Sequence, residues 1–388
     1  MKLAYKVIGL LLLSGVLHGC DKNKEDLTPK LVKIVIETPD GDKLDLNETT
    51  TLTATGYDQF DDVYDISNSL VWSKDSDHIS IEQNGTVTGI SVGTALVTAE
   101  AEGITKTQTI TVWDSTAPRI EIYVSDVADY WNLGPAQILK FDESGKNPEV
   151  FIQDNLGAPQ DILFLEDQEI VLISNVTTGK ITKYNSNTGS YLGIFASIAG
   201  GPTRMKIGSD GLLYVLQWKG DGKVLRFQLD GTPMGAFTSF GINESIGLDW
   251  DSDGNLYVSS YNENGATGFF VRKFDASGND LGTFIDSNLK GPTNIWFDDT
   301  GNLIVNDWLG GTIEKFSSSG AHMSNLVTGV SQIEGVDILD NGNIIVGVGS
   351  TSSINQYTSS GAFVKKLVTN GAGDLIKPNA VRIRRINY

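Results

Sequence analysis

The stretch GPTNIWFDDTGNLIVNDWLGGTIEKFSSSG, residues 291–320, decides how most of this chain folds. It contains a Gly-Pro start, an apolar run, an Asp-Thr-Gly-Asn turn, a second apolar run and a third run that ends in Phe. Short runs rich in β-branched and aromatic residues between turn residues predict strands joined by hairpins. The stretch 246–284, IGLDWDSDGNLYVSSYNENGATGFFVRKFDASGNDLGTF, follows the same order. The chain therefore repeats a unit of antiparallel strands.

The repeat has a regular length. The turn glycines Gly211, Gly254, Gly301 and Gly342 are 43, 47 and 41 residues apart. The units begin near Pro159, Pro202, Ser245, Pro292, Glu334 and Pro378. Four strands in a unit of this length are typical of one β-propeller blade.

The first unit, residues 119–156, is incomplete. It shows three strand-like runs, at 120–124, 136–141 and 149–153, and lacks an inner strand. The C-terminal run at 378–385 can supply that strand, which would close the ring and remove open sheet edges. We therefore predict a six-bladed propeller over residues 119–388, closed by the C-terminal strand. Arg382, Arg384 and Arg385 on this strand are expected to offset nearby acidic charge.

The repeats resemble NHL repeats over residues 119–388. The usual Asp…Asn-Arg-Ile segment of that family is reduced here to Lys180-Ile181, Lys223-Val224 and Thr312-Ile313. The resemblance implies a propeller but no particular function, because one fold hosts many activities.

Residues 31–113 have a different pattern, with short alternating runs broken by turns, which predicts an antiparallel sandwich. The stretch LVWSKDSDHISIEQNGTVTGISVGTALVTAEAEG, residues 70–103, resembles group 2 bacterial Ig-like domains. Its Asn84-Gly85 pair predicts a hairpin turn, and Trp72 is the expected core residue. The whole chain is thus expected to be all-β, an Ig-like β-sandwich followed by the propeller.

The N-terminus is expected to be a targeting segment. Lys2 and Lys6 precede an apolar run at 8–13 that is too short to span a bilayer. Leu17-His18-Gly19-Cys20 resembles the lipobox of bacterial lipoproteins, with His18 as an unusual occupant. The resemblance implies a signal peptide at 1–19, a lipid such as palmitate on Cys20 and a polar tether at 20–30. The alternative is an ordinary secretory signal with a chance Cys.

Two signals after Cys20 disagree about the membrane. Lys24-Glu25-Asp26 resembles the signal that sends Bacteroidetes lipoproteins to the outer face of the outer membrane. Asp21 would instead favour the inner membrane under enterobacterial sorting. We expect a lipid anchor in the outer membrane with exposure at the cell surface.

Composition excludes several functions. The chain has 48 acidic and 29 basic residues, a net charge of −19, so nucleic acid is a poor partner. A single Cys excludes a disulfide framework and a Cys-based zinc site. The three His residues, His18, His78 and His322, offer no Ser-His-Asp or Cys-His arrangement.

Propeller ligands usually bind at one mouth of the channel. The loops entering the inner strands align Gln160, Arg204, Ser245, Asn294, Glu334 and Asn379. The ends of the second strands align Asp126, Asn175, Trp218, Tyr261, Trp308 and Gly349, and Trp131 lies in the long loop of the first blade. The candidate ligand-binding residues are Trp131, Gln160, Arg204, Trp218, Tyr261, Asn294, Trp308, Glu334 and Asn379.

Aromatic rings beside amides suit carbohydrate, because sugar C–H faces stack on rings while amides bind hydroxyls. We therefore expect a binding protein for a glycan or a partner protein, serving polysaccharide uptake, with no catalytic residue, cofactor or metal. Alternatively, Trp218 and Trp308 pack between blades and the amides cap strand ends.

Two other functions stay open. Regucalcin-like gluconolactonases are six-bladed propellers that hold a divalent metal, and Glu334, Asn294 and Asn379 resemble such oxygen ligands, although no local motif matches. Streptogramin lyases resemble the repeat but need channel histidines, which this chain lacks. A structural docking scaffold would have a filled channel mouth.

Overall fold

The computed structural model describes residues 28–115, 119–128, 136–261 and 268–386. Nearly all of its regular structure is β-strand, which confirms the predicted all-β class. The chain divides into two compact units, Met1–Ala117 and Pro118–Tyr388.

The first unit contains three antiparallel or mixed sheets. Their strand orders are β1 (Leu31–Glu37), β4 (Thr53–Asp58), β5 (Val63–Tyr64); β2 (Lys43–Asp45), β10 (Ile104–Trp113), β9 (Gly93–Ala101), β6 (Val71–Lys74); and β3 (Thr49–Thr51), β8 (Thr86–Gly89), β7 (Ile79–Ile81). Trp72 is buried in the core with Ile79 and Val87, as expected. Its backbone N–H donates to Gln83 Oε1 and its carbonyl accepts from Gln83 Nε2, so the strand around it is fixed.

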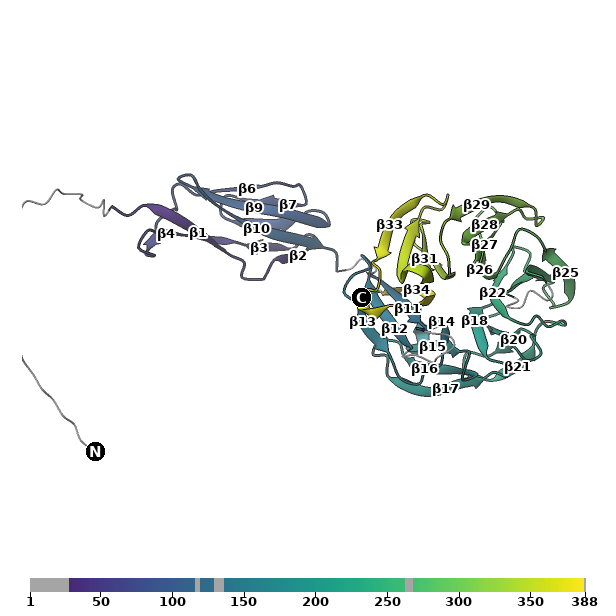
Figure 1. The fold of residues 1–388 in the computed structure, drawn as a ribbon. Coiled ribbons are helices and arrows are strands. Elements are labelled where there is room, and N and C mark those ends of the chain that lie inside the picture. Colours follow the sequence, from purple (N-terminus) through teal and green to yellow (C-terminus); the bar gives the residue numbers. More distant parts are fainter. Residues whose placement is uncertain (1–27, 116–118, 129–135, 262–267, 387–388) are drawn as a thin grey trace, which may run out of the picture. The chain divides into compact units, whose positions relative to one another are not determined.

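The second unit contains six four-stranded sheets arranged in a ring (Figure 1). From the inner strand outward, blade 1 is β34 (Pro378–Ile386), β11 (Arg119–Asp126), β12 (Gln137–Asp142), β13 (Glu149–Ile152); blade 2 is β14 (Pro159–Leu165), β15 (Ile170–Asn175), β16 (Lys180–Asn185), β17 (Tyr191–Ser197); and blade 3 is β18 (Pro202–Ile207), β19 (Leu213–Gln217), β20 (Leu225–Phe227), β21 (Pro233–Ala236).

The other three blades have the same order of strands. Blade 4 is β22 (Ser245–Trp250), β23 (Leu256–Ser260), β24 (Phe270–Phe274), β25 (Asp280–Ile285); blade 5 is β26 (Pro292–Phe297), β27 (Leu303–Asp307), β28 (Thr312–Phe316), β29 (His322–Thr328); and blade 6 is β30 (Ile333–Ile338), β31 (Ile344–Val348), β32 (Ser353–Tyr357), β33 (Phe363–Val368). The predicted six-bladed propeller is confirmed.

The repeated apolar strand explains how the blades pack on one another. Tyr214 of β19 packs edge-on against Trp250 of β22, with ring centroids 5.0 Å apart. Tyr257 of β23 packs in the same way against Phe297 of β26, also at 5.0 Å. Edge-to-face aromatic pairs add to the burial of apolar area. Each second strand therefore holds the inner strand of the next blade.

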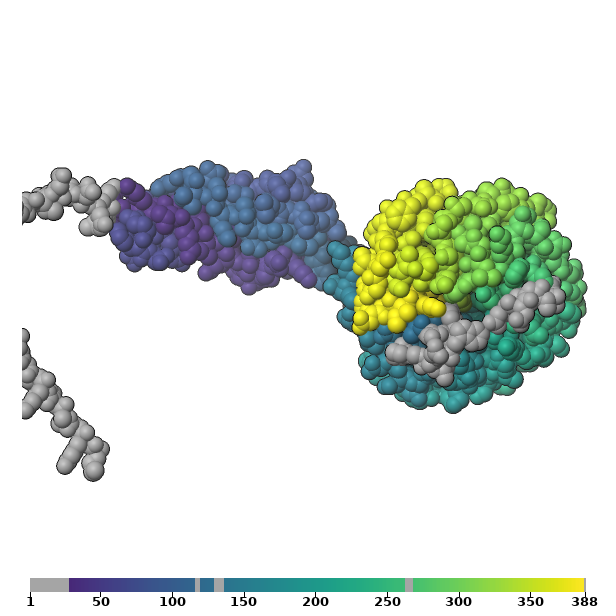
Figure 2. Space-filling view, in the orientation of Figure 1, coloured from purple at the N-terminus to yellow at the C-terminus, as the bar shows by residue number. Residues whose placement is uncertain are grey.

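The C-terminal strand closes the ring, as predicted. β34 pairs antiparallel with β11, Val124 lying opposite Val381. In the space-filling view, the yellow C-terminal part of the chain adjoins the blue-teal part that begins the propeller (Figure 2). Arg384 binds Glu166 through Nε and Nη2, each at 2.8 Å. The expectation that the arginines of this strand offset acidic charge is confirmed.

Candidate functional site

The inner strands are irregular where they leave the mouth. In each of the six described blades, the register between the first and second strands shifts within the first residues of the inner strand. A β-bulge of this kind re-aims side chains. As a result, Glu334, the second residue of β30, faces the mouth, while Arg204, the third residue of β18, borders a cavity further along the channel.

A pocket of about 540 Å³ lies at the mouth. Its floor comes from the second residues of four inner strands: Gln160, Ile246, Thr293 and Glu334. Its walls come from Val176, Thr177, Gly200, Trp218, Lys219, Tyr261, Trp308 and Lys377. The pocket is therefore built by all six blades.

Three aromatic residues form one wall of this pocket. Trp218, Tyr261 and Trp308 follow the second strands of blades 3, 4 and 5. Their backbone N–H groups donate to equivalent loop carbonyls, those of Gly201, Glu244 and Gly291, at 2.8, 2.9 and 2.9 Å. Each ring is half-buried, and the centroids of Trp218 and Tyr261 are 6.1 Å apart. The repeat thus places an aromatic residue at the same position three times in succession.

The residues at the ends of the second strands, one position before the aromatic residues and their equivalents, bind the backbone of the mouth loops. Asp126 Oδ1 and Oδ2 accept from the backbone N–H groups of Lys377 and Ile376 at 2.8 and 2.9 Å. Asn175 Oδ1 accepts from Gly157 at 2.8 Å. The alignment of Asp126 and Asn175 with the aromatic residues was therefore wrong by one position. Val127 and Val176 are the true equivalents, because their N–H groups make the same loop contact.

In blade 5, the side chain of Asp307 accepts hydrogen bonds from backbone N–H groups of the mouth loops in the same way. Its Oδ2 accepts from the N–H of Lys290 at 2.7 Å and its Oδ1 from that of Gly310 at 2.9 Å. Burial raises the pKa of Asp307, because the charged form loses water. The loops around Trp308 are consequently fixed by a carboxylate that lies beneath the pocket rim.

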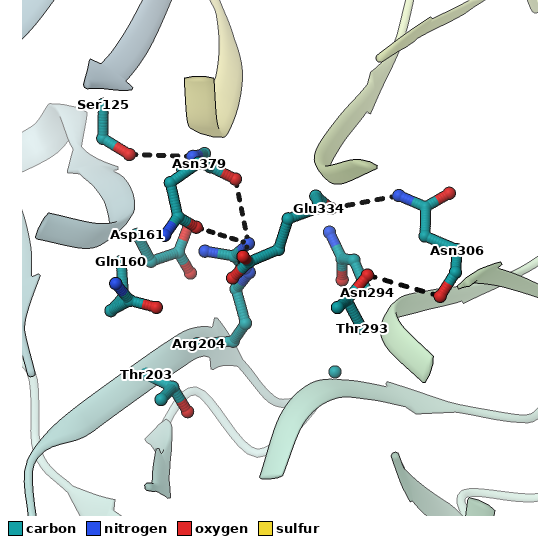
Figure 3. Close-up of polar contacts among 12 residues, drawn as sticks. Ser125, Gln160, Asp161, Thr203, Arg204, Thr293, Asn294, Asn306, Glu334 and Asn379 are labelled. Atoms are coloured by element: carbon teal, nitrogen blue, oxygen red, sulfur yellow. Dashed lines mark hydrogen bonds and ion pairs between the residues drawn. The ribbon is translucent and has the colours of Figure 1, made fainter. Parts of the chain in front are cut away.

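An ion pair crosses the channel beneath the pocket (Figure 3). Arg204 Nη2 lies 2.9 Å from Glu334 Oε1, 3.0 Å from the carbonyl oxygen of Asn379 and 3.2 Å from its Oδ1. Arg204 is 3% exposed. Its Nε and Nη1 are buried and have no hydrogen-bond partner in the described part of the chain.

This arrangement does not fit the metal site of a lactonase. Oxygens of Glu334 and Asn379 that would bind a divalent cation already face the Arg204 guanidinium. Asn294 borders the cavity on the other side of this ion pair. Among the described residues, no group of three or more His, Cys, Asp or Glu side chains is placed to hold a metal. A fixed cation thus takes the place that a metal would need.

The cavity beyond Arg204 has a volume of about 210 Å³ and is bordered by Asp161, Arg382 and Asp337 among others. Three aspartates of the inner strands accept hydrogen bonds from the inner strand of the following blade. Asp161 accepts from the N–H of Met205 at 2.8 Å, Asp249 from that of Phe297 at 2.9 Å, and Asp337 from that of Ile383 at 2.8 Å. Sequence reasoning missed this role, although acids within apolar strands were the available signal.

The predicted site residues therefore separate into three groups. Gln160, Trp218, Tyr261, Trp308 and Glu334 line the mouth pocket, and Arg204 and Asn294 border the cavity beyond. Asn379 binds Arg204 between the two. Trp131 and Cys20 lie outside the described residues. Lys219 and Lys377 line the pocket without having been predicted, although their places beside Trp218 and Pro378 were visible.

Comparison with known proteins defines the class. The sequence matches no family model and no curated protein. A chain of a nidogen/laminin complex has a TM-score of 0.56 and 13% identity, over 68% of this chain and 98% of its own. A protein of unknown function from Bacteroides caccae has a TM-score of 0.54 and 16% identity, over 70% and 100%. A proposed gluconolactonase has a TM-score of 0.48 and 15% identity, over 56% and 79%. The structural neighbours are β-propeller proteins, and likenesses at such identity show the fold alone.

Proposed function

We propose that this protein binds a carbohydrate in the pocket at the mouth of its propeller. The observation that carries the proposal is the wall of three half-buried aromatic residues, Trp218, Tyr261 and Trp308, in one pocket with polar groups. Aromatic faces bind the C–H faces of sugars, while a few placed polar groups bind hydroxyls. A pocket of about 540 Å³ has room for one or two sugar rings.

The pocket also speaks against the two other functions. A docking scaffold would have a filled mouth, whereas the described residues enclose a pocket of about 540 Å³ there. A metal-dependent lactonase would need free oxygen ligands, whereas Arg204 occupies those of Glu334 and Asn379. Binding without chemistry is the function that these contacts support.

Binding of sugars by the purified protein tests the proposal. We expect a glycan array to identify a ligand, and calorimetry to show at least a tenfold weaker Kd for Trp218→Ala and Trp308→Ala. The matched control is Phe363→Ala, since Phe363 is 60% exposed on the outer strand β33. The proposal fails if no sugar binds, or if the two Trp variants bind as tightly as the control.

We further propose that the protein is anchored in the outer membrane through a lipid on Cys20 and faces the cell surface. The support is the sequence of the N-terminal segment. Within the described ranges, no helix is long and apolar enough to cross a bilayer. Labelling of cells with a palmitate analogue should mark the wild type and not Cys20→Ser. Protease added to intact cells should remove the wild-type protein, and protection from it would contradict surface exposure.

A further inference from the structure

We propose that the cavity beyond Arg204 is a second binding site, which holds a single neutral sugar ring against the Arg204 guanidinium. This site is separate from the pocket at the mouth, so the inference goes beyond the proposed function and does not depend on it. It starts from a buried charged group that uses only part of its capacity for hydrogen bonds.

The Arg204 guanidinium has donors left over. An arginine side chain carries five N–H groups and no acceptor. Nη2 binds Glu334 Oε1 and the two oxygens of Asn379 (Figure 3). Nε and Nη1 are buried and have no hydrogen-bond partner in the part of the chain that the structure describes. Because a buried donor without a partner costs free energy, these N–H groups call for an acceptor from outside the chain.

The cavity gives such an acceptor a place. Arg204 borders this cavity and is not among the residues that line the mouth pocket. The side chain of Lys206 is 45% exposed and Ile338 is 37% exposed, and both border the cavity, so it opens to solvent. A cavity of about 150 Å³ holds benzene. The volume of about 210 Å³ therefore has room for one sugar ring.

The carboxylates beside the cavity favour a neutral ligand over an anion. Asp161 and Asp337 both border it. Arg382, which lies 3.1 Å from Asp161 Oδ1 and 3.9 Å from Asp337 Oδ2, is already engaged with both. An anion would accept from Arg204 but would also lie beside two like charges, which repel it. A hydroxyl group can accept from Arg204 and donate to a carboxylate, so it suits both kinds of neighbour.

The apolar part of the lining suits the C–H faces of a sugar ring. Leu163, Leu248 and Val336 border the cavity together with the charged groups. Small-molecule sites typically combine apolar walls with a few placed polar groups. A purely apolar ligand would leave the Arg204 donors without an acceptor. A ring with hydroxyl groups on its edge and C–H groups on its faces therefore fits this lining best.

Crystals of the wild-type protein test the site directly. After soaking in glucose, galactose or mannose, we expect density for a sugar ring in the cavity with at least one of them, with an oxygen at hydrogen-bond distance from Arg204 Nε or Nη1. Parallel soaks in glucuronate and sulfate test the charge. Only ordered water in the cavity after every hexose soak, or an anion bound there instead of a hexose, overturns the inference.

Calorimetry with the same hexoses tests binding in solution. Val336→Phe narrows the cavity and should weaken the Kd by roughly tenfold or more. Val364→Phe, the same change at a 43% exposed position of β33, is the matched control and should keep the wild-type Kd. An unchanged Kd in Val336→Phe overturns the inference. A sugar seen in crystals without measurable binding in solution is binding at crystal concentration only, and it also overturns the inference.

A second variant tests the donors themselves. Arg204→Met with Glu334→Leu removes the guanidinium without leaving the partner charge buried and alone. It should weaken the hexose Kd by roughly tenfold, because a hydroxyl loses its charged donor. Thermal melting verifies that each variant is folded. If one of them is not, the soaks of the wild type still decide.

Variants at the mouth separate this inference from the proposed function. If hexose binding weakens in Trp218→Ala and Trp308→Ala but not in Val336→Phe, the inference falls and the proposed function stands. If a hexose occupies the cavity but no arrayed glycan depends on the two Trp residues, the inference stands and the proposed function falls. If neither a hexose nor an arrayed glycan binds, both fall.

Discussion

Arg204 and Glu334 form an ion pair across the propeller channel, although they are 130 residues apart in the sequence and belong to blades 3 and 6 of six. The side chain of each is 4% exposed. A buried pair of this kind costs desolvation, which only good geometry and additional hydrogen bonds offset. Here Asn379 supplies such bonds from blade 1, so three blades meet at one guanidinium.

Removal of one partner should be more harmful than removal of both. We expect Glu334→Leu alone to lower the free energy of unfolding by roughly 3–5 kcal/mol, because the Arg204 charge stays buried. The double variant Arg204→Met with Glu334→Leu should lose less than the sum of the single variants. Urea unfolding of the wild type, Arg204→Met, Glu334→Leu and the double variant measures this coupling, and additive losses would show that the pair does not act as a unit.

The closing strand should be essential for a monomeric ring. Truncation after Lys377 removes β34 and exposes the edge of β11. An open sheet edge can pair with another chain, so the truncated protein should be prone to association. We expect the truncated protein to aggregate in size-exclusion chromatography and to lose amide protection in β11. Removal of residues 387–388 alone is the control and should have no effect. A monodisperse truncated protein would refute this part of the fold.

Acid should weaken the propeller through its turn aspartates. Burial opposes ionisation of Asp298, but hydrogen bonds from Lys315, Asn302 and Thr300 outweigh it and lower its pKa below the usual 3.8. A carboxyl with a lowered pKa stabilises the fold at pH values above its unfolded pKa, and this stabilisation is lost as the pH falls below about 4. Asp298→Asn should therefore reduce the difference in stability between pH 7 and pH 3.

Asp253→Asn, at an exposed acid in the hairpin of blade 4, is the control. Urea unfolding at the two pH values gives the comparison. The same acid dependence in Asp298→Asn and in the wild type would exclude this residue as a source. Asp307 has the opposite sign, since its pKa is raised, so its protonation on acidification favours the folded state.

Because two inner strands approach closely at Gly247, replacement of this glycine by a larger residue should destabilise the propeller. A Cβ at this position would lie 2.3 Å from the Thr293 carbonyl oxygen and 2.9 Å from the Ile295 nitrogen, so β22 and β26 would have to separate. We expect Gly247→Ala to lower the Tm by several degrees. Gly282→Ala, where φ is +93° and a Cβ meets open space, should cost only about 1 kcal/mol of backbone strain. Equal melting temperatures for the two variants would contradict the close approach.

The sequence predicted the propeller well, because its units repeat and each unit is a local hairpin structure. Closure by the C-terminal strand followed from one missing strand in the first unit. The site was harder to predict because it depends on the bulge at the start of each inner strand. Alignment placed Arg204 beside Gln160, whereas the bulge separates them into different layers.

Polar contacts between distant blades also could not be predicted from the repeated sequence. Nothing in the sequence pairs Arg204 with Glu334, because the pairing depends on the diameter of the ring. The two lysines that line the pocket could not be predicted for a related reason. Lys219 and Lys377 occupy different positions in their repeats, so no aligned column brought them together.

β34 is synthesised after the other strands of the propeller, yet it completes blade 1, whose other strands are synthesised first. Blade 1 leaves the ribosome with three strands and waits for more than two hundred residues before its fourth partner exists. Until β34 has been synthesised, the edge of β11 in this sheet has no pairing strand. Closure of the ring therefore requires translation through β34, since a chain that ends earlier lacks the strand that completes blade 1.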